Sequence, residues 1–516
     1  MRRSRYRIIA ALAAAVLLFA GLRWQPWAAR PAAEAPGAEA AHAADFEPTT
    51  LRLLFPLEKP AGHDEVMRAV EAKLARDGLP FRLQFTFVPL EQYWNKVRLA
   101  AASGEPYDLV WTAFSNISDL VSKKALAPLD DALRKHGPHL LANTPDYSFQ
   151  GATIDGRIYG IPRVMPKAEF QNFVQIRGDI RKKYGLPEIR SAADMDRYLE
   201  TVAREEPGMI PYFFDTGRFL LREYGNVALL AGEYLNAPVY IDPADPALRV
   251  RVTYESDFFR NIMLKGREWQ EKGYVPHLPG AAAFPDPEAV FLRGEVAVTW
   301  SFLLKQTERI DAFKAANPQG ELENVFLHPD KPKYLFAAAD NLLSVLSTSD
   351  RVDEAVAFVD WIRANQENYD LFTYGIEGEH YRRTGNSVSY EGIQPEKRYM
   401  PISWAWNDIA YARFSRHISP DYEAELRAWD ADAVISPTMG FVPDLAPVKS
   451  EIAQLNVVIS EYLPRLYDRR NDWDAEMRKF RDKLEDAGIA NVVAEIQAQF
   501  DAFREAQRAA ADAAGR

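Results

Sequence analysis

The stretch Phe81-Arg82-Leu83-Gln84-Phe85-Thr86-Phe87 alternates apolar and polar side chains without a break. Successive side chains of a β-strand point to opposite faces, so this alternation predicts a strand with one buried face. Helical spacing of apolar residues flanks it on both sides, in residues 63–77 and again from Leu90 to Ala102. The stretch therefore predicts a strand between two helices.

Two further strands are predicted just outside these helices. Thr50 to Phe55 precedes the first helix, and Asp108-Leu109-Val110-Trp111 follows the second and leads into a loop at Ser115-Asn116. Strands separated by helices of this length pair in parallel through right-handed crossovers, which predicts an open α/β sheet. Such sheets bind ligands beyond the carboxyl ends of their strands. Binding residues are therefore expected in the loops after Phe55 and after Trp111.

The rest of the chain continues this alternation and then becomes helical. Further strands are predicted at residues 172–177, 294–300 and 341–346. Helices are predicted at residues 191–205, 254–272 and 351–365, and the C-terminal section is predicted to hold three more at 449–462, 472–487 and 491–511. The expected architecture is α/β with two sheets and a helical C-terminal section.

The first 43 residues have the character of an export signal. Four arginines precede an uncharged run from Ile8 to Leu22, which is shorter than the roughly 20 residues that span a bilayer. Ala41-His42-Ala43 has the small-x-small form of a cleavage site. We expect an extracytoplasmic protein, in the periplasm or at the cell surface, either cleaved after Ala43 or held by an uncleaved anchor.

Composition excludes several classes of function. The 516 residues contain no cysteine, which removes disulfides, zinc-thiolate and iron–sulfur sites, thiol nucleophiles and a lipid-modified N-terminal cysteine. The net charge of −11 disfavours nucleic acid as a partner. Eight scattered histidines and the absence of nucleotide-binding and zincin motifs predict no cofactor and no metal.

One pair of carboxylates raises an enzymatic alternative. Glu377 and Glu379 lie in a glycine-containing loop that follows Tyr374. Glycoside hydrolysis needs two carboxyls about 5–10 Å apart across the scissile bond, and residues two positions apart on a loop serve that geometry poorly. We therefore predict no catalytic residues. Glu377 is kept as a candidate hydrogen-bonding contact to a ligand, with a solvated turn as the alternative.

Aromatic residues beside polar ones favour a carbohydrate site. A sugar ring has apolar C–H faces and a polar rim, so it binds flat aromatic side chains and directional hydrogen-bonding groups. Aromatics at predicted strand ends or in loops, with polar neighbours, are the candidates. They are Trp111 with Thr112, Ser115 and Asn116; Trp300 with Ser301; Tyr374; and Trp404 and Trp406 with Asn407. Arg163 and Lys167 are candidate cleft cations. Burial in the core is the alternative for each aromatic, and it is the expectation for Trp269 and Trp361.

Several motifs in a fixed order resemble a known family. The motifs are Asp108-Leu109-Val110-Trp111, Leu126-Ala127-Pro128-Leu129, Ile158-Tyr159-Gly160-Ile161-Pro162, Phe291 to Val298 and Asp353 to Val359. Together they resemble the family 1 extracellular solute-binding proteins of ABC importers, which are maltose-binding-protein-like. The section from Tyr374 to Tyr381, with Gly440-Phe441 and residues 447–451, resembles the large lipoprotein-type members that take up oligosaccharides.

The resemblance implies a two-lobed periplasmic-binding-protein fold of class II, in which the lobes close over one ligand. Lobe 1 would comprise residues 45–160 and 322–366, and lobe 2 residues 161–321 and 367–516. It also implies ligand contacts in the segment from Trp111 to Asn116, at Trp300 and Ser301, and between Trp404 and Asn407. The missing cysteine departs from the lipoprotein pattern and leaves retention to the N-terminal segment.

The predicted function is capture of an oligosaccharide and its delivery to the membrane permease subunits of an ABC importer, by a protein expected to be monomeric. Peptides or other small polar solutes remain alternative ligands. Two other functions stay open at this point, a secreted glycoside hydrolase that uses Glu377 or another carboxylate and a ligand-sensing partner of a membrane receptor.

Overall fold

The computed structural model describes residues 47–169, 172–213, 215–232, 234–276, 287–300, 306–336 and 340–514. The predicted export signal and Ser301 lie outside these residues. The chain divides into two compact units, each built from two separate stretches. Unit 1 comprises Met1–Lys167 and Ala337–Asp432, and unit 2 comprises Ala168–Phe336 and Ala433–Arg516. Each unit has its own hydrophobic core, as the predicted α/β architecture requires.

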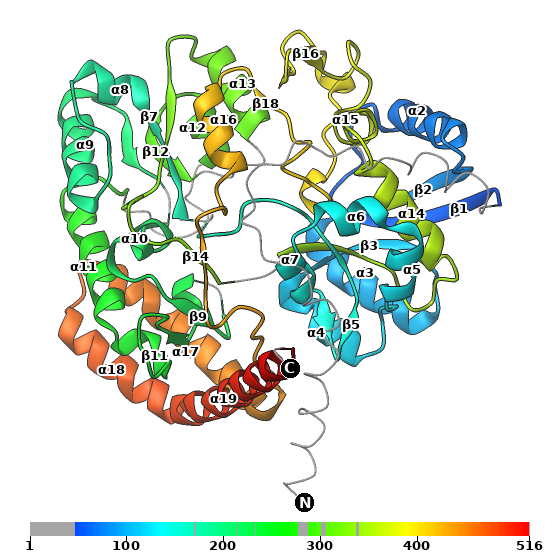
Figure 1. Cartoon of the computed structure of the whole chain (residues 1–516). Helices are drawn as coiled ribbons and strands as arrows, with labels where there is room; N and C mark the ends of the chain where they lie inside the picture. Colours follow the sequence, from blue (N-terminus) through cyan, green and yellow to red (C-terminus); the bar gives the residue numbers. More distant parts are fainter. Residues whose placement is uncertain are drawn as a thin grey trace, which may run out of the picture. The chain divides into compact units, whose positions relative to one another are not determined.

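Unit 1 is built on a five-stranded sheet in the order β2-β1-β3-β15-β6 (Figure 1). β1 pairs in parallel with β2 and β3, as predicted, whereas β15 runs antiparallel to both β3 and β6. The strands are β1 (Thr49–Pro56), β2 (Phe81–Val88), β3 (Leu109–Ala113), β6 (Ile161–Pro162) and β15 (Asn341–Ser344). The carboxyl ends of β1, β2 and β3 therefore share one edge of the sheet.

Helices surround this sheet, and several of them pack on it. The main ones are α2 (His63–Arg76), α3 (Leu90–Ser103), α4 (Phe114–Ser122), α5 (Asp130–His136), α6 (Pro138–Asn143), α7 (Asp146–Gln150), α14 (Val352–Ile362), α15 (Gln366–Tyr374) and α16 (Pro420–Arg427). Short strands complete the unit, namely β4 (Thr153–Ile154), β5 (Arg157–Ile158), β16 (Arg382–Thr384), β17 (Ser387–Ser389) and β18 (Phe414–Ser415). Val66, Val70 and Leu74 of α2 are fully buried, one helical turn apart, which confirms the predicted apolar face of this helix.

The lobe boundaries predicted from the resemblance differ from this division. They place residues 367–432 in lobe 2, whereas these residues belong to unit 1. The reason is packing, because Trp406 stacks on Phe55 of β1 at 5.9 Å between ring centroids and lies against Phe372 at 4.7 Å. Trp406 is therefore a core residue of unit 1, and not a side chain in a loop as its neighbours suggested.

Unit 2 contains a four-stranded sheet in the order β13-β7-β12-β8 and a three-stranded sheet in the order β11-β10-β9. Their strands are β7 (Val174–Arg177), β8 (Ile210–Tyr212), β9 (Ala228–Leu230), β10 (Val239–Ile241), β11 (Val250–Val252), β12 (Val296–Trp300) and β13 (Leu322–Val325). In addition, β14 (Tyr334–Leu335) and β19 (Val434–Ile435) form a separate parallel pair. Before β12 come the helices α8 (Gly178–Lys183), α9 (Ala192–Glu205), α10 (Thr216–Tyr224), α11 (Asp257–Glu271) and α12 (Pro287–Leu292). Helix α13 (Gln306–Ala316) follows β12. Ser191 caps α9, as predicted, by accepting a hydrogen bond from the Asp194 N–H.

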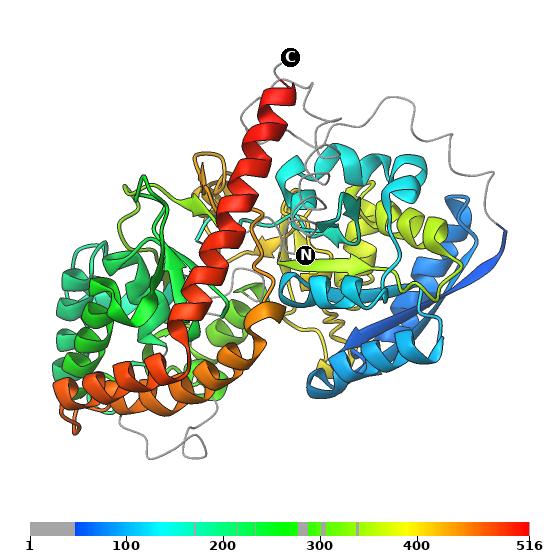
Figure 2. The same cartoon turned by 90° about the horizontal axis from the view of Figure 1, so that it is seen from below.

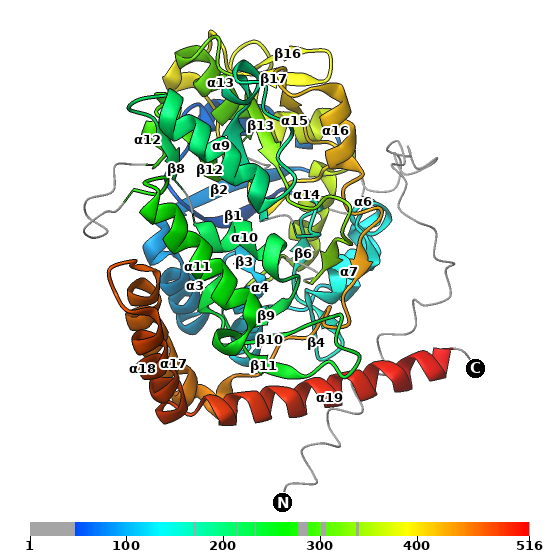
Figure 3. The same ribbon diagram turned by 90° about the vertical axis from the view of Figure 1, so that its left-hand side faces the viewer.

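The C-terminal helices extend unit 2, as predicted. α17 (Lys449–Tyr467) and α18 (Trp473–Asp486) pack side by side (Figure 3), and α19 (Ile489–Ala514) is a single long helix (Figure 2). α19 packs along β11, the edge strand of the three-stranded sheet. There the backbone N–H of Val250 donates to Oε1 of Gln497 in α19 at 2.7 Å. An edge strand otherwise presents unpaired backbone groups to solvent, so this helix satisfies part of that edge.

Candidate functional site at the carboxyl edge of unit 1

Three tryptophans meet where β1, β2 and β3 end in unit 1. Trp111 lies in the middle of β3, and its ring centroid lies 4.6 Å from that of Trp94 in α3 and 6.3 Å from that of Trp404. Trp111 is 9 % exposed, whereas Trp94 and Trp404 are half-buried. We call Trp94, Trp111 and Trp404 the aromatic cluster. It combines a fixed central ring with two partly open ones.

Neutral polar groups fix the orientation of the central ring. The indole N–H of Trp111 donates to Oδ1 of Asn341 at 2.8 Å. Asn341 opens β15, and its backbone pairs with Ala113 in the antiparallel ladder. The Tyr93 hydroxyl donates to the Trp111 carbonyl at 2.9 Å, and burial raises its pKa far above the usual range, so it remains a donor. The cluster is thus held by uncharged hydrogen bonds.

The loop after β1 adds apolar surface and a strained backbone at the same edge of the sheet. Leu57 follows β1 with φ = 72°, in the left-handed region that costs a residue with a Cβ atom free energy. Its side chain is 37 % exposed, and Leu90 at the end of the loop after β2 is 42 % exposed. Strained residues gather at ligand sites more often than elsewhere, which supports the prediction that binding residues follow Phe55.

The segment after Trp111 differs from the loop that the sequence suggested. α4 begins directly at Phe114, so Ser115 and Asn116 lie in its first turn. Oδ1 of Asn116 accepts from the Ala113 N–H at 3.0 Å and thereby caps the helix. Thr112 is fully buried, and its hydroxyl lies 2.7 Å from that of Ser344 in β15. Thr112 and Asn116 therefore hold the strand and helix that position Trp111.

The predicted candidates near the C-terminal part of unit 1 are dispersed. Asn407 is buried, with Oδ1 accepting from the Tyr369 hydroxyl at 3.1 Å. The hydroxyl of Tyr374, at the end of α15, accepts from the Arg413 N–H at 2.8 Å. Arg163 forms an ion pair with Asp340, and its Nε donates to Oδ1 at 2.9 Å. These three side chains are bound within unit 1 and none of them contacts the aromatic cluster through a described hydrogen bond.

Glu377 lies in an exposed turn and forms an ion pair with Arg383, whose Nε lies 3.0 Å from Oε2. Glu379 is exposed in the same turn. A general acid for glycoside hydrolysis needs a raised pKa, which burial against apolar groups provides and an exposed ion pair does not. The surroundings of the two carboxylates give the hydrolase alternative no support.

In unit 2, Trp300 is the last residue of β12, and its surroundings are cationic. The Trp300 carbonyl accepts from Nη1 of Arg309 at 2.7 Å, and this guanidinium lies 5.4 Å from the Trp300 ring centroid and 3.8 Å from that of Phe291. Ser301, the neighbouring candidate, falls outside the described residues. Trp269 is fully buried against Tyr212, and Trp361 is 5 % exposed, as predicted for core residues.

Trp94 and Asn341 are site residues that the sequence did not single out. Trp94 lies in α3, the helix that follows the carboxyl end of β2, and the helical periodicity does not distinguish it from core positions. Asn341 depends on the register between β3 and β15, which no local pattern reveals.

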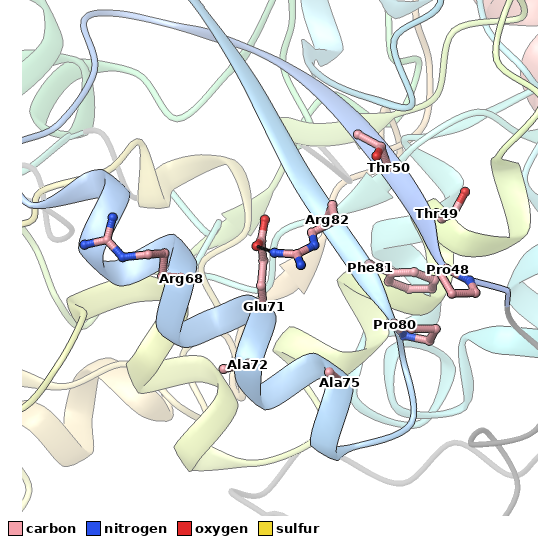
Figure 4. Close-up of a pocket in the computed structure, with 10 residues that line it drawn as sticks. All are labelled: Pro48, Thr49, Thr50, Arg68, Glu71, Ala72, Ala75, Pro80, Phe81 and Arg82. Carbon is pink, nitrogen blue, oxygen red and sulfur yellow. Dashed lines mark hydrogen bonds and ion pairs between the residues drawn. The ribbon is translucent and has the colours of Figure 1, made fainter.

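Two hollows in unit 1 are lined by residues of α2 and β2. One of about 480 Å³ is lined by residues at the amino ends of β1 and β2 and by α2, where Glu71 faces Arg82 (Figure 4). A second, of about 390 Å³, is lined by His63, Phe85 and Phe87 among others. Ligands of open α/β sheets bind at carboxyl ends, so the first hollow is on the wrong side of the sheet for that role.

Two searches of the described residues concern metals and membranes. Within the described part of the chain, no group of three or more histidine, aspartate or glutamate side chains is arranged to hold a metal ion. In that same part, no helix has the length and apolar character needed to cross a membrane.

The sequence matches two family models. Residues 72–377 match the model described as bacterial extracellular solute-binding protein, and residues 437–505 match a domain of unknown function. A carbohydrate ABC transporter substrate-binding protein of Streptococcus pneumoniae is 22 % identical over 459 residues, which cover 86 % of this chain and 89 % of the relative.

Solved structures share the fold of this chain. The N-glycan transport solute binding protein of Streptococcus pneumoniae superimposes with a TM-score of 0.73 at 18 % identity, covering 89 % of this chain and 99 % of the other. An alginate-binding protein solved without calcium superimposes with a TM-score of 0.62 at 16 % identity over 90 % of this chain and 100 % of the other. A substrate-binding protein of a Streptococcus pneumoniae ABC transporter, solved in complex with kestose, superimposes with a TM-score of 0.56 at 17 % identity. The superposition covers 88 % of this chain and 99 % of the other. The periplasmic-binding-protein fold implied by the resemblance is thereby confirmed.

The family model spans more than half of the chain, and a family of solute-binding proteins binds its ligands without catalysing a reaction. The protein is therefore not an enzyme, as predicted, and the hydrolase alternative is dropped. The chain belongs to the family of bacterial extracellular solute-binding proteins.

Proposed function

We propose that this protein is the extracytoplasmic component of a carbohydrate ABC importer and that it captures an oligosaccharide. The observation that carries the proposal is the aromatic cluster, in which two half-buried rings flank Trp111 at the carboxyl edge of the unit 1 sheet. The carbohydrate ABC transporter substrate-binding protein that resembles this chain supports it, as do structural neighbours solved in complex with oligosaccharides.

The chemistry of the cluster suits a sugar ring. Indole faces are flat and apolar, and they pack on the C–H face of a pyranose or furanose, while hydroxyls of the rim form hydrogen bonds with amides and carboxylates. The side-chain carbonyl oxygen of Asn341 already accepts a hydrogen bond from the Trp111 indole, which keeps the ring in place before a ligand binds. A site that is pre-organised in this way loses less conformational entropy on binding.

Binding becomes transport through a change in conformation. A ligand that contacts both units favours the closed arrangement by its difference in affinity for the two states, and a near-complete shift needs about 5.5 kcal/mol. The closed, loaded form would then dock on the permease transmembrane subunits as a monomer. Trp300, Ser301 and Glu377 remain proposed secondary contacts of the ligand.

The proposal is tested by calorimetric and fluorescence titration with xylo-, manno-, gluco-, fructo- and pectin-derived oligosaccharides. At least one class should bind, and Trp94→Ala should weaken that binding about tenfold, because stacking on one ring is worth roughly 1.5 kcal/mol. Trp269→Phe, deep in the core of unit 2, is the matched control and should leave affinity unchanged. A folded protein that ignores every saccharide but binds a peptide mixture would refute the carbohydrate assignment.

Localisation is proposed to be periplasmic or at the cell surface, with residues 1–43 acting as signal or anchor. The family description supports the extracellular part of this assignment. Mass spectrometry of the native protein decides between the two forms, since cleavage after Ala43 predicts a mature chain that begins at Ala44.

A further inference from the structure

One carboxylate lies directly beside the aromatic cluster. Asp340 precedes Asn341, the residue whose side chain holds the Trp111 indole, and its Oδ1 accepts from the Asn341 N–H at 2.8 Å. Because Asn341 pairs with Ala113 at the carboxyl end of β3, Asp340 lies beyond that end, where ligands of open α/β sheets bind. A ligand that stacks on the cluster therefore binds close to this carboxylate.

Asp340 has a hydrogen-bonding position left for a ligand. An ionised carboxylate offers about four lone pairs, two on each oxygen. Oδ1 accepts from Nε of Arg163 at 2.9 Å as well as from the Asn341 N–H, and Oδ2 accepts from Nη2 of Arg163. Among the described residues, the second lone pair of Oδ2 has no donor, and the side chain is 32 % exposed. A sugar hydroxyl can therefore donate to Oδ2 in a charge-assisted hydrogen bond.

The cation that balances Asp340 is more deeply buried than the carboxylate. Arg163 follows β6, whose carboxyl end lies at the same edge because β6 and β3 both run antiparallel to β15. Its side chain is only 8 % exposed, and its Nε and Nη2 both donate to Asp340. Nζ of Lys167 donates to the main-chain carbonyls of Arg163 and Met165, at 3.2 and 3.4 Å. A ligand at this edge therefore meets the carboxylate of the ion pair and not the guanidinium.

Asp340 remains ionised throughout the physiological pH range. Burial by itself would raise the pKa of this carboxyl group. The charge of Arg163, the hydrogen bonds from it and the charge of Lys167 outweigh burial and hold the pKa of Asp340 at about 2. Near neutral pH the group is therefore a hydrogen-bond acceptor and never a donor, and its negative charge is permanent there.

The loops at the ends of β1 and β2 add to this negative charge. Glu58 follows β1 and Glu91 lies in the first turn of α3, and both residues are exposed. Lys59, in the same loop as Glu58, pairs with Asp64 at 2.6 Å between Nζ and Oδ2. A carboxylate on the ligand would therefore meet like charges at this edge of the sheet, which disfavours its binding.

We propose that Asp340 selects uncharged oligosaccharides at the aromatic cluster, by accepting a hydrogen bond from a sugar hydroxyl and by repelling saccharides that carry carboxylates. The inference rests on the proposed capture of an oligosaccharide and narrows its ligand class. Where specificity is set by repulsion, removal of the repelling group admits the ligands that it excluded. Loss of a carboxylate that only held the site in shape would weaken neutral and acidic ligands alike.

The test compares saccharides that differ only in charge. Cello-, manno- and fructo-tetrasaccharides are titrated by calorimetry, each in its native form and after oxidation of its primary hydroxyls to carboxylates, together with tetragalacturonate and its neutral methyl ester. At least one neutral form should bind, about tenfold or more tightly than the matching acidic form. In Asp340→Asn the neutral form should bind about fivefold more weakly and the acidic form about fivefold more tightly.

Three further variants separate the charge of Asp340 from its place in the fold. Asp350→Asn is the matched control, because it removes an 81 % exposed carboxylate from the segment after β15, and it should change neither affinity. Asp340→Glu keeps the negative charge and should keep the preference for the neutral form, even where both affinities fall. If Asp340→Asn folds poorly because Arg163 has lost its partner, Asp340→Asn with Arg163→Gln removes both charges and should still narrow the difference between the two forms.

Equal affinities of the unaltered protein for a neutral saccharide and its acidic form, or a preference for the acidic form, would overturn the inference and leave the carbohydrate function standing. So would an Asp340→Asn variant that loses affinity for both forms to the same extent. Absence of binding to every saccharide, in a protein shown to be folded, would refute the proposed function and this inference with it.

Discussion

Aromatic rings have different neighbours in the two units. At the carboxyl edge of unit 1, Trp94, Trp111 and Trp404 pack on one another, and a neutral amide holds the central indole. In unit 2, arginines lie over several rings. Arg309 lies 3.8 Å from the centroid of Phe291, Arg218 lies 3.5 Å from that of Tyr234, and Arg222 lies 4.5 Å from that of Phe326.

The difference separates rings that can accept a sugar from rings that are already engaged. A cation over an aromatic face occupies the surface on which a sugar would stack, and it contributes about 0.5–2 kcal/mol to the fold instead. Trp111 lies within β3 and Trp300 ends β12, so both belong to a strand, yet Trp111 packs on two other indoles whereas Arg309 lies beside the Trp300 ring. Five predictions test this contrast, in order of decreasing effect.

Acid should destabilise unit 1 through a histidine among its aromatic rings. Burial lowers the pKa of His63 from 6.5 to about 4, although Asp64 opposes the shift. The unfolded chain therefore takes up a proton first as pH falls, and stability should decline from pH 6.5 down to about 4, by about 3 kcal/mol in all. Urea unfolding across this pH range measures it. His63→Phe should remove this component, and the exposed His417→Gln should not.

Arg309→Ala should destabilise unit 2 by roughly 2 kcal/mol. The variant removes a charge-assisted hydrogen bond to the Trp300 carbonyl and a cation stacked on Phe291. Chemical denaturation checks the free energy of unfolding, with Arg204→Ala, a 63 % exposed arginine in the same unit, as the control. Equal effects of the two variants would mean that the guanidinium contributes nothing by lying over the rings.

Trp404→Ala should weaken oligosaccharide binding about tenfold, or roughly 1.4 kcal/mol, while Trp300→Ala should change it by less than about threefold. The reason is that Trp404 presents a half-buried ring in the aromatic cluster, whereas Arg309 lies beside the Trp300 ring. Calorimetry with the tightest-binding saccharide measures both. If Trp300→Ala proves the more harmful variant, the contrast between the units is wrong as a guide to binding.

Asn341→Ala should cost about 1 kcal/mol of binding free energy, because the Trp111 indole loses its acceptor and is no longer held in one orientation. The emission spectrum of the ligand-free protein should shift at the same time, which distinguishes a moved ring from a lost contact. Normal affinity together with normal emission would show that the neighbouring rings alone hold Trp111.

Glu377→Gln should have the smallest effect, within about 0.5 kcal/mol for both stability and binding. The carboxylate is 47 % exposed and pairs with Arg383 across solvent, and exposed ion pairs contribute little. Titration of the variant with the same saccharide measures it. A loss of tenfold or more would restore Glu377 to the list of primary ligand contacts.

Much of the fold follows from local pattern. The alternation at Phe81–Phe87 and the helical spacing beside it predict β1, β2 and β3 with their parallel pairing, and the C-terminal helices follow from periodicity alone. The return of residues 367–432 to unit 1 does not, because it depends on Trp406 packing under β1 at long range.

The candidate site was predictable only in part. Trp111 follows from the rule that ligands bind at carboxyl strand ends, and Trp404 from its polar surroundings. Asn341 requires the β3–β15 register, and the engagement of Trp300 requires knowledge of where Arg309 lies in space. Long-range partners of this kind leave no trace in a single sequence.

The contact between Gln497 and Val250 has a consequence for biosynthesis. The edge of β11 in unit 2 is completed only after α19 has been synthesised. Unit 1 can complete its fold only after the chain has been synthesised as far as residue 432. Contacts between residues so distant in sequence form slowly, because the long loops must close before any contact offsets their entropy. We therefore expect a nascent chain of this design to complete its fold only late in synthesis.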